Sequence, residues 1–185
     1  GLLEVILPEL ARLVVREPAG WDDTLAILRQ LHNPTFAMAL AALWRDVFIH
    51  TGLAAVQAAL SRWKLPNEDS GGALMLLRNE EIVQGANFHP WPQVQRLLIA
   101  PRAEELVRFC EAVDVALGGG FAGTGYCRMK LSLPAAELNP PPLITGEDLK
   151  RLGIALGPAY KDILEAVRDE QLEGRIASLA DALEL

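Results

Sequence analysis

The residues best suited to bind a ligand lie near the C-terminus, in the stretch from Gly157 to Lys161. A glycine followed by a proline at a helix start leaves backbone N–H groups free, and Lys161 follows about one turn later. The helix after it places Arg168 two turns beyond Lys161 on the same outer face. This pattern predicts a site for an anion such as phosphate.

A short helix is expected just before this stretch. Thr145 and Asp148 stand three residues apart, which suits a helix start, and Gly153 suits a left-handed helix end. Leu149 and Leu152 should then point inward. A helix, a glycine-bounded turn and a second helix resemble the helix-hairpin-helix devices that hold nucleic-acid backbones without reading bases. The predicted RNA-binding residues are Lys150, Arg151, Gly157, Lys161 and Arg168.

The same residues have a simpler interpretation. Glycine at a helix end and proline at a helix start are ordinary helix punctuation. Four acidic residues on the second helix also weaken its attraction for phosphate, namely Asp162, Glu165, Asp169 and Glu170. The spacing of these residues therefore fits two interpretations: a phosphate-binding site, or residues that only start and end helices.

Other residues that could hold a metal or a nucleotide are sparse. Cys110 and Cys127 are the only cysteines, and no Cys-x-x-Cys or His-x-x-His lies near them, so we expect buried free thiols and no zinc site. The glycines at 118–120, with Gly123 and Gly125 after them, follow no hydrophobic strand and precede no Lys-Ser or Lys-Thr. They are therefore expected to form a flexible break and not a nucleotide-binding loop.

Helical periodicity runs through most of the chain, and no segment alternates like a strand, so the predicted fold class is all-α. The proline-rich stretch at 139–142 is expected to separate a multi-helical body, residues 1–138, from a small helical tail, residues 139–185. Within the body we expect a loop at 16–20, an Asn33-Pro34 helix start, a helix capped by Thr51, and helices beginning near residues 21, 67, 92 and 101.

The composition limits the possible functions. The 185 residues are 51% hydrophobic and carry a net charge of −7, which argues against a strongly basic domain that coats nucleic acid. Any RNA must then use a local basic surface. No apolar run reaches the roughly 18 residues that span a bilayer, and the first residues lack the features of a signal peptide, so we expect a cytoplasmic protein without membrane partners.

The sequence motifs at both ends of the chain are more specific than residues that only start or end a helix. Residues 139–185 contain Pro-Pro-Pro-Leu-Ile-Thr-Gly-Glu-Asp-Leu, Leu-Gly-Ile, Gly-Pro, Lys-Asp-Ile-Leu-Glu and Arg-Asp-Glu-Gln-Leu-Glu-Gly-Arg-Ile, and the chain starts with Gly-Leu-Leu-Glu-Val-Ile-Leu-Pro-Glu-Leu. The last third resembles the C-terminal end of bacterial CCA-adding enzymes and related tRNA nucleotidyltransferases and poly(A) polymerases. The start resembles the segment that follows the catalytic head and neck in that family.

The resemblance implies that catalysis and tRNA binding belong to different parts of the molecule. In that family a head with Gly-Ser and Asp-x-Asp signatures holds metal ions for nucleotidyl transfer, and helical parts hold tRNA. This chain lacks the head signatures, so we expect no catalysis and no cofactor of its own, with Mg²⁺ and nucleoside triphosphates bound only at the head. The expected partners are tRNA, or an RNA 3′ end, and that head domain.

The middle of the body resembles a degenerate His-Asp phosphohydrolase domain. Asp23 occupies the place of the first histidine, Arg45 replaces the histidine of the His-Asp pair, and Asp46 remains as a residual metal position. No histidine pair occurs near residues 76–80. Arg45 is expected to form a salt bridge with Asp46 in place of a metal ion. The alternative function is that of a catalytically inactive domain of this kind that binds a protein partner. A third function is that of an active phosphohydrolase, which needs a divalent metal.

Two further groups of residues have open roles. The four tryptophans are expected to pack in the core, although exposed tryptophans can stack on bases. Arg96, Arg102 and Arg108 recur at six-residue spacing, and with Arg128 and Lys130 they either line a groove or form solvated charge.

Overall fold

The computed structural model describes residues 1–16, 18–154 and 157–183, and within these residues it is helical without any strand. The prediction of an all-α fold is confirmed. The elements in chain order are α1 (Leu2–Ile6), α2 (Pro8–Arg16), α3 (Pro18–Gln30), α4 (Phe36–Thr51), α5 (Leu53–Arg62), α6 (Asn67–Gln84), the 3₁₀ helix η1 (Ala86–Phe88), α7 (Trp91–Leu98), α8 (Ala103–Leu117), α9 (Ala122–Leu131), α10 (Ala135–Leu138), α11 (Gly146–Arg151), α12 (Pro158–Leu172) and α13 (Leu179–Leu183).

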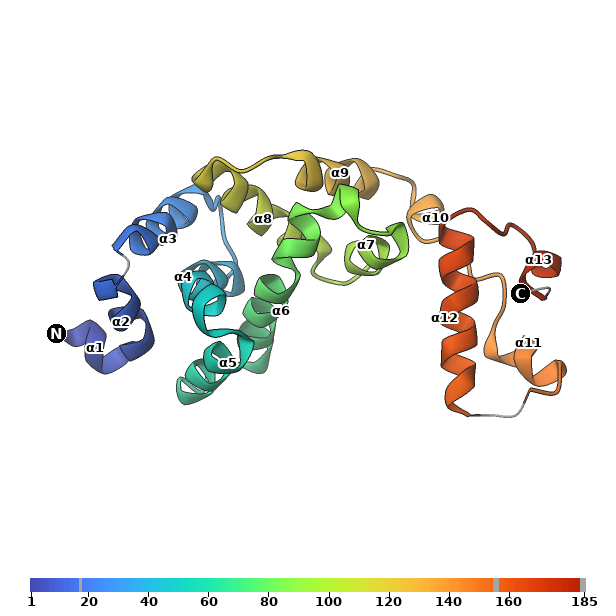
Figure 1. Ribbon diagram of the computed structural model, residues 1–185, viewed down its shortest axis with the longest axis horizontal. Helices are drawn as coiled ribbons and strands as arrows, with labels where there is room; N and C mark the ends of the chain where they lie inside the picture. The colour runs from blue at the N-terminus through green and yellow to red at the C-terminus, as the bar shows by residue number, and fades with distance from the viewer. Residues whose placement is uncertain (17, 155–156, 184–185) are drawn as a thin grey trace.

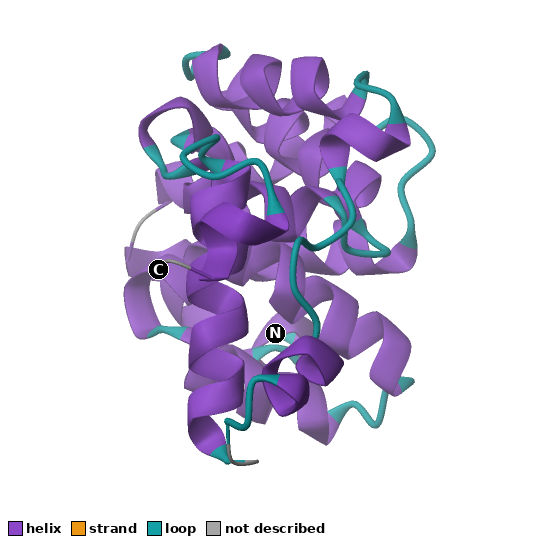
Figure 2. Cartoon of the chain, turned by 90° about the vertical axis from the view of Figure 1, so that its right-hand side faces the viewer, coloured by secondary structure: helices purple, strands orange, loops and turns teal. Residues whose placement is uncertain are grey.

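The helices form an arch (Figure 1). Helices α3, α8 and α9 follow its convex side, α4 to α7 lie beneath them, and α1 and α2 close one end. At the other end α12 hangs from the arch with α11 and α13 beside it. Figure 2, viewed from that end, shows α12 in front and the helical body behind it.

The core of the body is built around α4. Its residues Trp44 and Val47 are fully buried, and the helix packs between α3, α5 and α6. The pair Gly71-Gly72 does not interrupt α6, because Gly72 lies where α6 meets α4: a Cβ there would stand 2.9 Å from Cβ of Ala37. A small residue at this point lets the two helices approach closely.

The tail has a small hydrophobic cluster of its own. Its buried members are Ile144, Leu149, Tyr160, Val167 and Ala182. None of them belongs to the larger cluster of the body, whose described members run from Leu7 to Leu138. The two clusters lie on either side of the proline-rich stretch at 139–142, while the division into two domains at that point stays a prediction.

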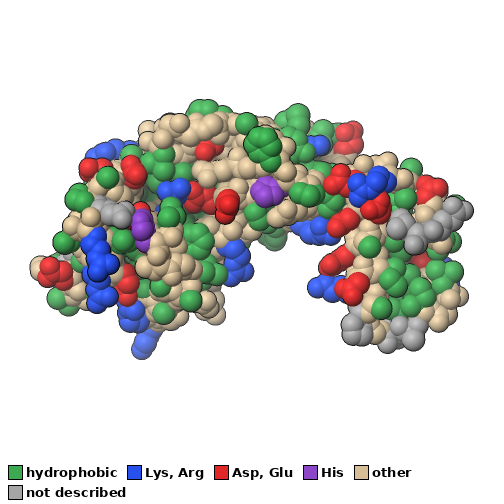
Figure 3. All heavy atoms as spheres, viewed as in Figure 1, with side chains coloured by type: hydrophobic (Ala, Val, Ile, Leu, Met, Phe, Trp, Pro, Cys, Tyr) green, Lys and Arg blue, Asp and Glu red, His purple; other side chains and the backbone are tan. Residues whose placement is uncertain are grey.

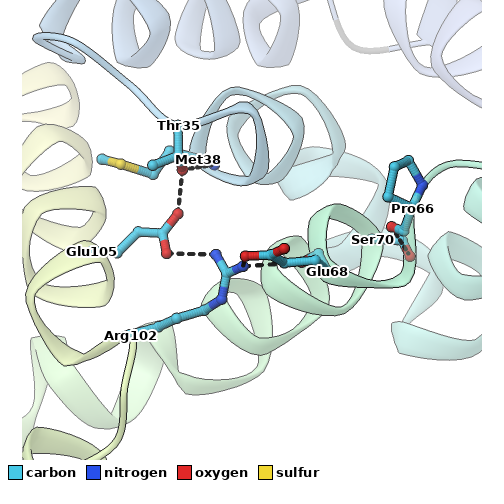
Figure 4. Close-up of polar contacts among 7 residues, drawn as sticks. All are labelled: Thr35, Met38, Pro66, Glu68, Ser70, Arg102 and Glu105. Atoms are coloured by element: carbon cyan, nitrogen blue, oxygen red, sulfur yellow. Dashed lines mark hydrogen bonds and ion pairs between the residues drawn. The ribbon is translucent and has the colours of Figure 1, made fainter.

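Several predicted helix starts were wrong. Helix α3 begins at Pro18, inside the expected loop, since proline fits the first helical position. Helix α4 is capped by Thr35 and not by Asn33, because the Thr35 hydroxyl accepts a hydrogen bond from the Met38 N–H at 3.2 Å (Figure 4). Thr51 ends α4 instead of capping the next helix, and the chain turns at Gly52, where φ is 81°.

Two expectations for later segments also need correction. The flexible break at the glycines is shorter than the glycine-rich sequence indicates, because α9 already begins at Ala122. Leu152 is 53% exposed although it was expected to point inward, since it lies just past the last residue of α11 and no longer continues the helix face. The cap of α11 is as predicted: the Thr145 N–H donates to the Asp148 carboxylate at 2.9 Å, and Gly153 has a φ of 75°.

Candidate nucleic-acid interface

Helix α12 determines where the predicted tail cations lie. It starts after Gly157, which is exposed and has an extended backbone, and the Tyr160 N–H donates to the Gly157 carbonyl at 3.0 Å. Tyr160 and Val167 bury one face of α12 in the tail cluster. Lys161, whose side chain is 78% exposed, and Arg168, which is half-buried, follow these two residues along the helix and therefore lie about 100° around it, beside the buried face.

A groove of about 710 Å³ runs along this side of α12, between the helix, the linker that precedes α11 and the end of α7. Three cationic side chains line it: Lys161 and Arg168 from α12, and Arg96 from α7. Its other lining residues are Asn139, Pro142, Ile144, Thr145, Tyr160, Leu164 and Glu165. Two of the five predicted RNA-binding residues thus meet in one place.

Arg168 is the cation whose charge is least compensated in this groove. Its guanidinium donates to Oε1 of Gln171 at 2.9 Å and to Oδ1 of Asn139 at 2.8 Å, and both acceptors are neutral amides. Within the described parts of the chain no carboxylate forms an ion pair with it. Burial, together with the nearby charge of Arg96, lowers the pKa of Arg168, but a guanidinium stays protonated at neutral pH.

The other two groove cations have loose or exposed acidic partners. Nζ of Lys161 lies 3.7 Å from Oε1 of Glu165, and Arg96 pairs with Asp169, each of those two side chains being 43% exposed. Exposed pairs of this kind contribute little and exchange readily with water. Both cations can therefore turn toward an anion in the groove.

The remaining predicted residues lie outside the groove. Lys150 pairs with Glu147, and Arg151 lies 3.6 Å from Asp148, both within α11. Gly157 is exposed at the start of α12 but does not line the groove. Residues 139–185 contain five Lys or Arg and nine Asp or Glu, so the tail outside the groove is acidic.

The arginine series of the body does not form a shared groove. Arg102 bonds Glu105 at 2.7 Å and Glu68 at 3.3 Å, as Figure 4 shows. Arg108 donates to backbone carbonyls of the loop between α3 and α4, and Arg128 pairs with Glu104 and Glu111. These cations hold body helices together, and Arg96 is the member of the series that faces the tail.

The tryptophans serve mainly as packing groups. Trp44 is completely buried, and its ring meets Trp63 edge to face at a centroid distance of 5.8 Å. Trp91 packs against Tyr126, and the ammonium of Lys130 lies 4.4 Å from the Trp91 ring centre. These contacts favour core packing over base stacking.

The residual metal position has a different role in the structure. A Cβ on Gly20 would lie 2.6 Å from the Asp46 carboxylate, so Asp46 lies against the first turn of α3. Nδ1 of His50 is 3.4 Å from Oδ1 of Asp46. Across the described ranges, no three His, Cys, Asp or Glu side chains are grouped as a metal site.

The expected salt bridge between Arg45 and Asp46 was wrong. Nη2 of Arg45 instead lies 2.7 Å from Oε1 of Glu80 on α6, and Nε of Arg45 donates to the same oxygen. Neighbouring residues on a helix point about 100° apart, so Arg45 and Asp46 face different surroundings. Arg45 faces α6, and Asp46 faces α3.

Both cysteines are buried free thiols, as predicted. Burial raises the pKa of Cys110 well above its ordinary value and that of Cys127 to about 11, so both stay protonated at neutral pH. Burial also raises the pKa of Asp114, which accepts hydrogen bonds from Thr124 at 2.9 Å and Gln84 at 3.1 Å. These groups lie between α8 and α9 and belong to the core.

Comparison of the sequence with models of known protein families gave no match, and comparisons with curated proteins and with solved structures likewise found nothing similar. Of the helices described, none combines the length and the apolar character needed to cross a membrane.

Proposed function

We propose that this chain is the tRNA-binding, non-catalytic C-terminal portion of a tRNA nucleotidyltransferase of the CCA-adding and poly(A) polymerase family. Its task is to position the RNA 3′ end for a catalytic head that the chain does not contain. The observation that carries the proposal is Arg168, a half-buried cation with neutral partners, which faces a groove together with Lys161 and Arg96. The resemblance of residues 139–185 to that family supports the same assignment.

The shape of the molecule suits this task. Figure 3 shows a concavity between the body and the tail, with Lys and Arg side chains on both of its edges and acidic side chains among them on the tail. Contacts to phosphates fix the register of a nucleic acid without reading its sequence. On this proposal Mg²⁺ and nucleoside triphosphates belong to the head, and the chain contributes only RNA binding.

The test is filter binding of tRNA at two salt concentrations. Arg168→Ala and Lys161→Ala should each weaken binding for every tRNA sequence tried and lower the slope of log affinity against log salt by about 1. Arg175→Ala is the matched control, because Arg175 is exposed, pairs with Glu170 on the same segment and lies outside the groove. Its binding should equal that of the unaltered chain.

The proposal would be overturned if neither groove substitution changed the affinity for tRNA.

The second candidate is a protein-interaction module without affinity for tRNA. One observation favours it: α1 and α2 expose Leu2, Val5, Ile6 and Val15, each by more than half. An exposed apolar patch of this kind commonly marks a protein contact. If the unaltered chain does not bind tRNA in the assay, and a protein partner binds over α1, this candidate is selected.

A further inference from the structure

The groove beside α12 has an apolar floor as well as a cationic rim. Its floor comes from Pro142 and Ile144 of the linker and from Tyr160 and Leu164 of α12. Phosphates alone do not need such a floor, since backbone contacts are made by charged and polar groups. A ligand that suits both parts combines a negative charge with a flat apolar face.

The walls of the groove are held in place without any ligand. Nε2 of Gln171 donates to the Pro141 carbonyl at 2.8 Å, which ties the linker to α12. Oδ1 of Asn139 accepts from Arg168 at 2.8 Å and from the buried Gln95 at 3.2 Å, which ties the linker to the body. The groove is therefore largely preformed, so that binding orders few further groups.

We propose that this groove takes one unpaired nucleotide of the bound RNA, with the base against Pro142 and Leu164 and the phosphate at Arg168. Lys161 and Arg96 flank that phosphate. The inference rests on the proposed function and adds that the RNA is held at an unpaired residue and not along a duplex. The groove volume of about 710 Å³ is within the size range of small-molecule sites and leaves room for a base and its sugar phosphate.

The balance of charge argues for a nucleotide over a neutral apolar ligand. Three cations and one carboxylate, Glu165, line the groove. Because the rest of the tail is acidic, the excess positive charge is confined to this place. Contact between a base and an apolar or aromatic surface adds affinity that does not depend on the base sequence.

The experiment compares two probes on the full chain by fluorescence anisotropy: a labelled single-stranded hexanucleotide RNA and a labelled RNA duplex of the same length. The single strand should bind at least about fivefold more tightly, the lower end of what stacking of one base contributes. Leu164→Gln and Pro142→Ser should remove this preference, while Arg168→Ala should weaken both probes. Leu152→Gln is the control, because Leu152 is 53% exposed and lies outside the groove.

Pro142 is exposed, so its substitution keeps the tail folded, and circular dichroism checks the fold of each variant. Equal binding of both probes, with Arg168→Ala weakening both and the floor variants weakening neither, would overturn this inference and leave the proposed function intact. Binding of neither probe by a chain that binds tRNA in the filter assay would overturn this inference alone, and binding of neither the probes nor tRNA would overturn both. Binding of an acidic amphipathic peptide to the floor of the groove, when neither RNA probe binds, would assign the groove to a protein partner instead.

Discussion

Arg45 and Glu80 form the least exposed ion pair that the structure describes, with side chains 17% and 8% exposed. Each charge loses most of its hydration on folding, and the partner charge offsets that loss. The pair joins α4 to α6 near the buried Cys110, whose thiol lies 4.0 Å from the Glu80 carbonyl. Removing one partner would leave the other charge buried without compensation.

We therefore expect Arg45→Ala to lower the free energy of unfolding by about 3 to 5 kcal/mol, as loss of one partner of a buried pair does. The double variant Arg45→Met/Glu80→Leu should recover most of this loss, because apolar groups of similar size need no compensation. Urea denaturation followed by circular dichroism measures both effects.

Arg62→Ala provides the comparison. Arg62 bonds both oxygens of Glu9, at 2.7 and 2.8 Å, but its side chain is 50% exposed, so the loss should be about 1 kcal/mol or less. If Arg45→Ala costs no more than Arg62→Ala, the buried pair does not stabilise the contact between α4 and α6.

The sequence predicted a salt bridge from Arg45 to the adjacent Asp46, because Arg45 takes the place of a histidine in the His-Asp pair that the segment resembles. It could not identify Glu80, which lies on another helix, and the nearest acid in the chain was the wrong choice. Helix geometry separates Arg45 from Asp46, whereas packing of α4 on α6 brings Glu80 to it.

Helix α9 shows how one glycine sets the approach of two elements. A Cβ on Gly123 would lie 2.0 Å from the backbone carbonyl oxygen of Gln84 at the end of α6. Two residues later, a Cβ on the exposed Gly125 would meet nothing within 4 Å. Both glycines belong to the same helix, but only Gly123 is required by packing.

Gly123→Ala should destabilise the protein by at least about 2 kcal/mol, because overpacking against backbone forces α9 away from α6. Gly125→Ala should stabilise it by roughly 0.5 to 1 kcal/mol, since alanine favours the helix. Thermal or urea unfolding of the two variants gives the comparison directly. Similar effects of the two substitutions would contradict the close approach of α9 to α6.

The helices themselves were largely predictable, and their ends were not. Apolar spacing identified α4, α6, α8 and α12, and the cap of α11 followed from Thr145 and Asp148. The start of α9 was missed because glycine is a weak helix former, and a tertiary contact outweighs that preference here. Local signals do not report such contacts.

The two hydrophobic clusters of the protein differ greatly in size. The body cluster includes fully buried residues from α4, α6 and α8, whereas the tail cluster has five buried residues. Segments with little buried apolar surface open more readily than a large core. The tail meets the body mainly through α7 and α12 and through polar bonds such as Arg96 to Asp169.

Amide hydrogen exchange should therefore be markedly faster in α11 and α12 than in α4, α6 and α8. Asp169→Asn should speed exchange in α12 further, because it weakens the bond to Arg96, and should leave α4 unchanged. Mass spectrometry of peptic fragments resolves these segments. Equal protection of α12 and α4 would show that the two clusters unfold as one.

The candidate groove was only partly visible in the sequence. Lys161 and Arg168 follow from helix periodicity, but Arg96 comes from α7, and its position beside α12 depends on how the tail meets the body. The regular spacing of Arg96, Arg102 and Arg108 left a common groove and solvated surface charge both open. In the structure, carboxylates and loop carbonyls of the body hold Arg102 and Arg108.

The acidic surface of the tail has a consequence for how a polyanion would arrive. Lys150, Arg151 and Arg175 are each paired with a carboxylate, and the tail has nine Asp or Glu against five Lys or Arg. An approach toward α11 or toward the end of α12 therefore meets a net repulsion that grows as salt is lowered. On the proposed function, an RNA strand is attracted to the tail at the groove of Arg96, Lys161 and Arg168, where cations outnumber carboxylates. It would dock in one alignment and would not slide along the surface, as it can on a uniformly basic protein.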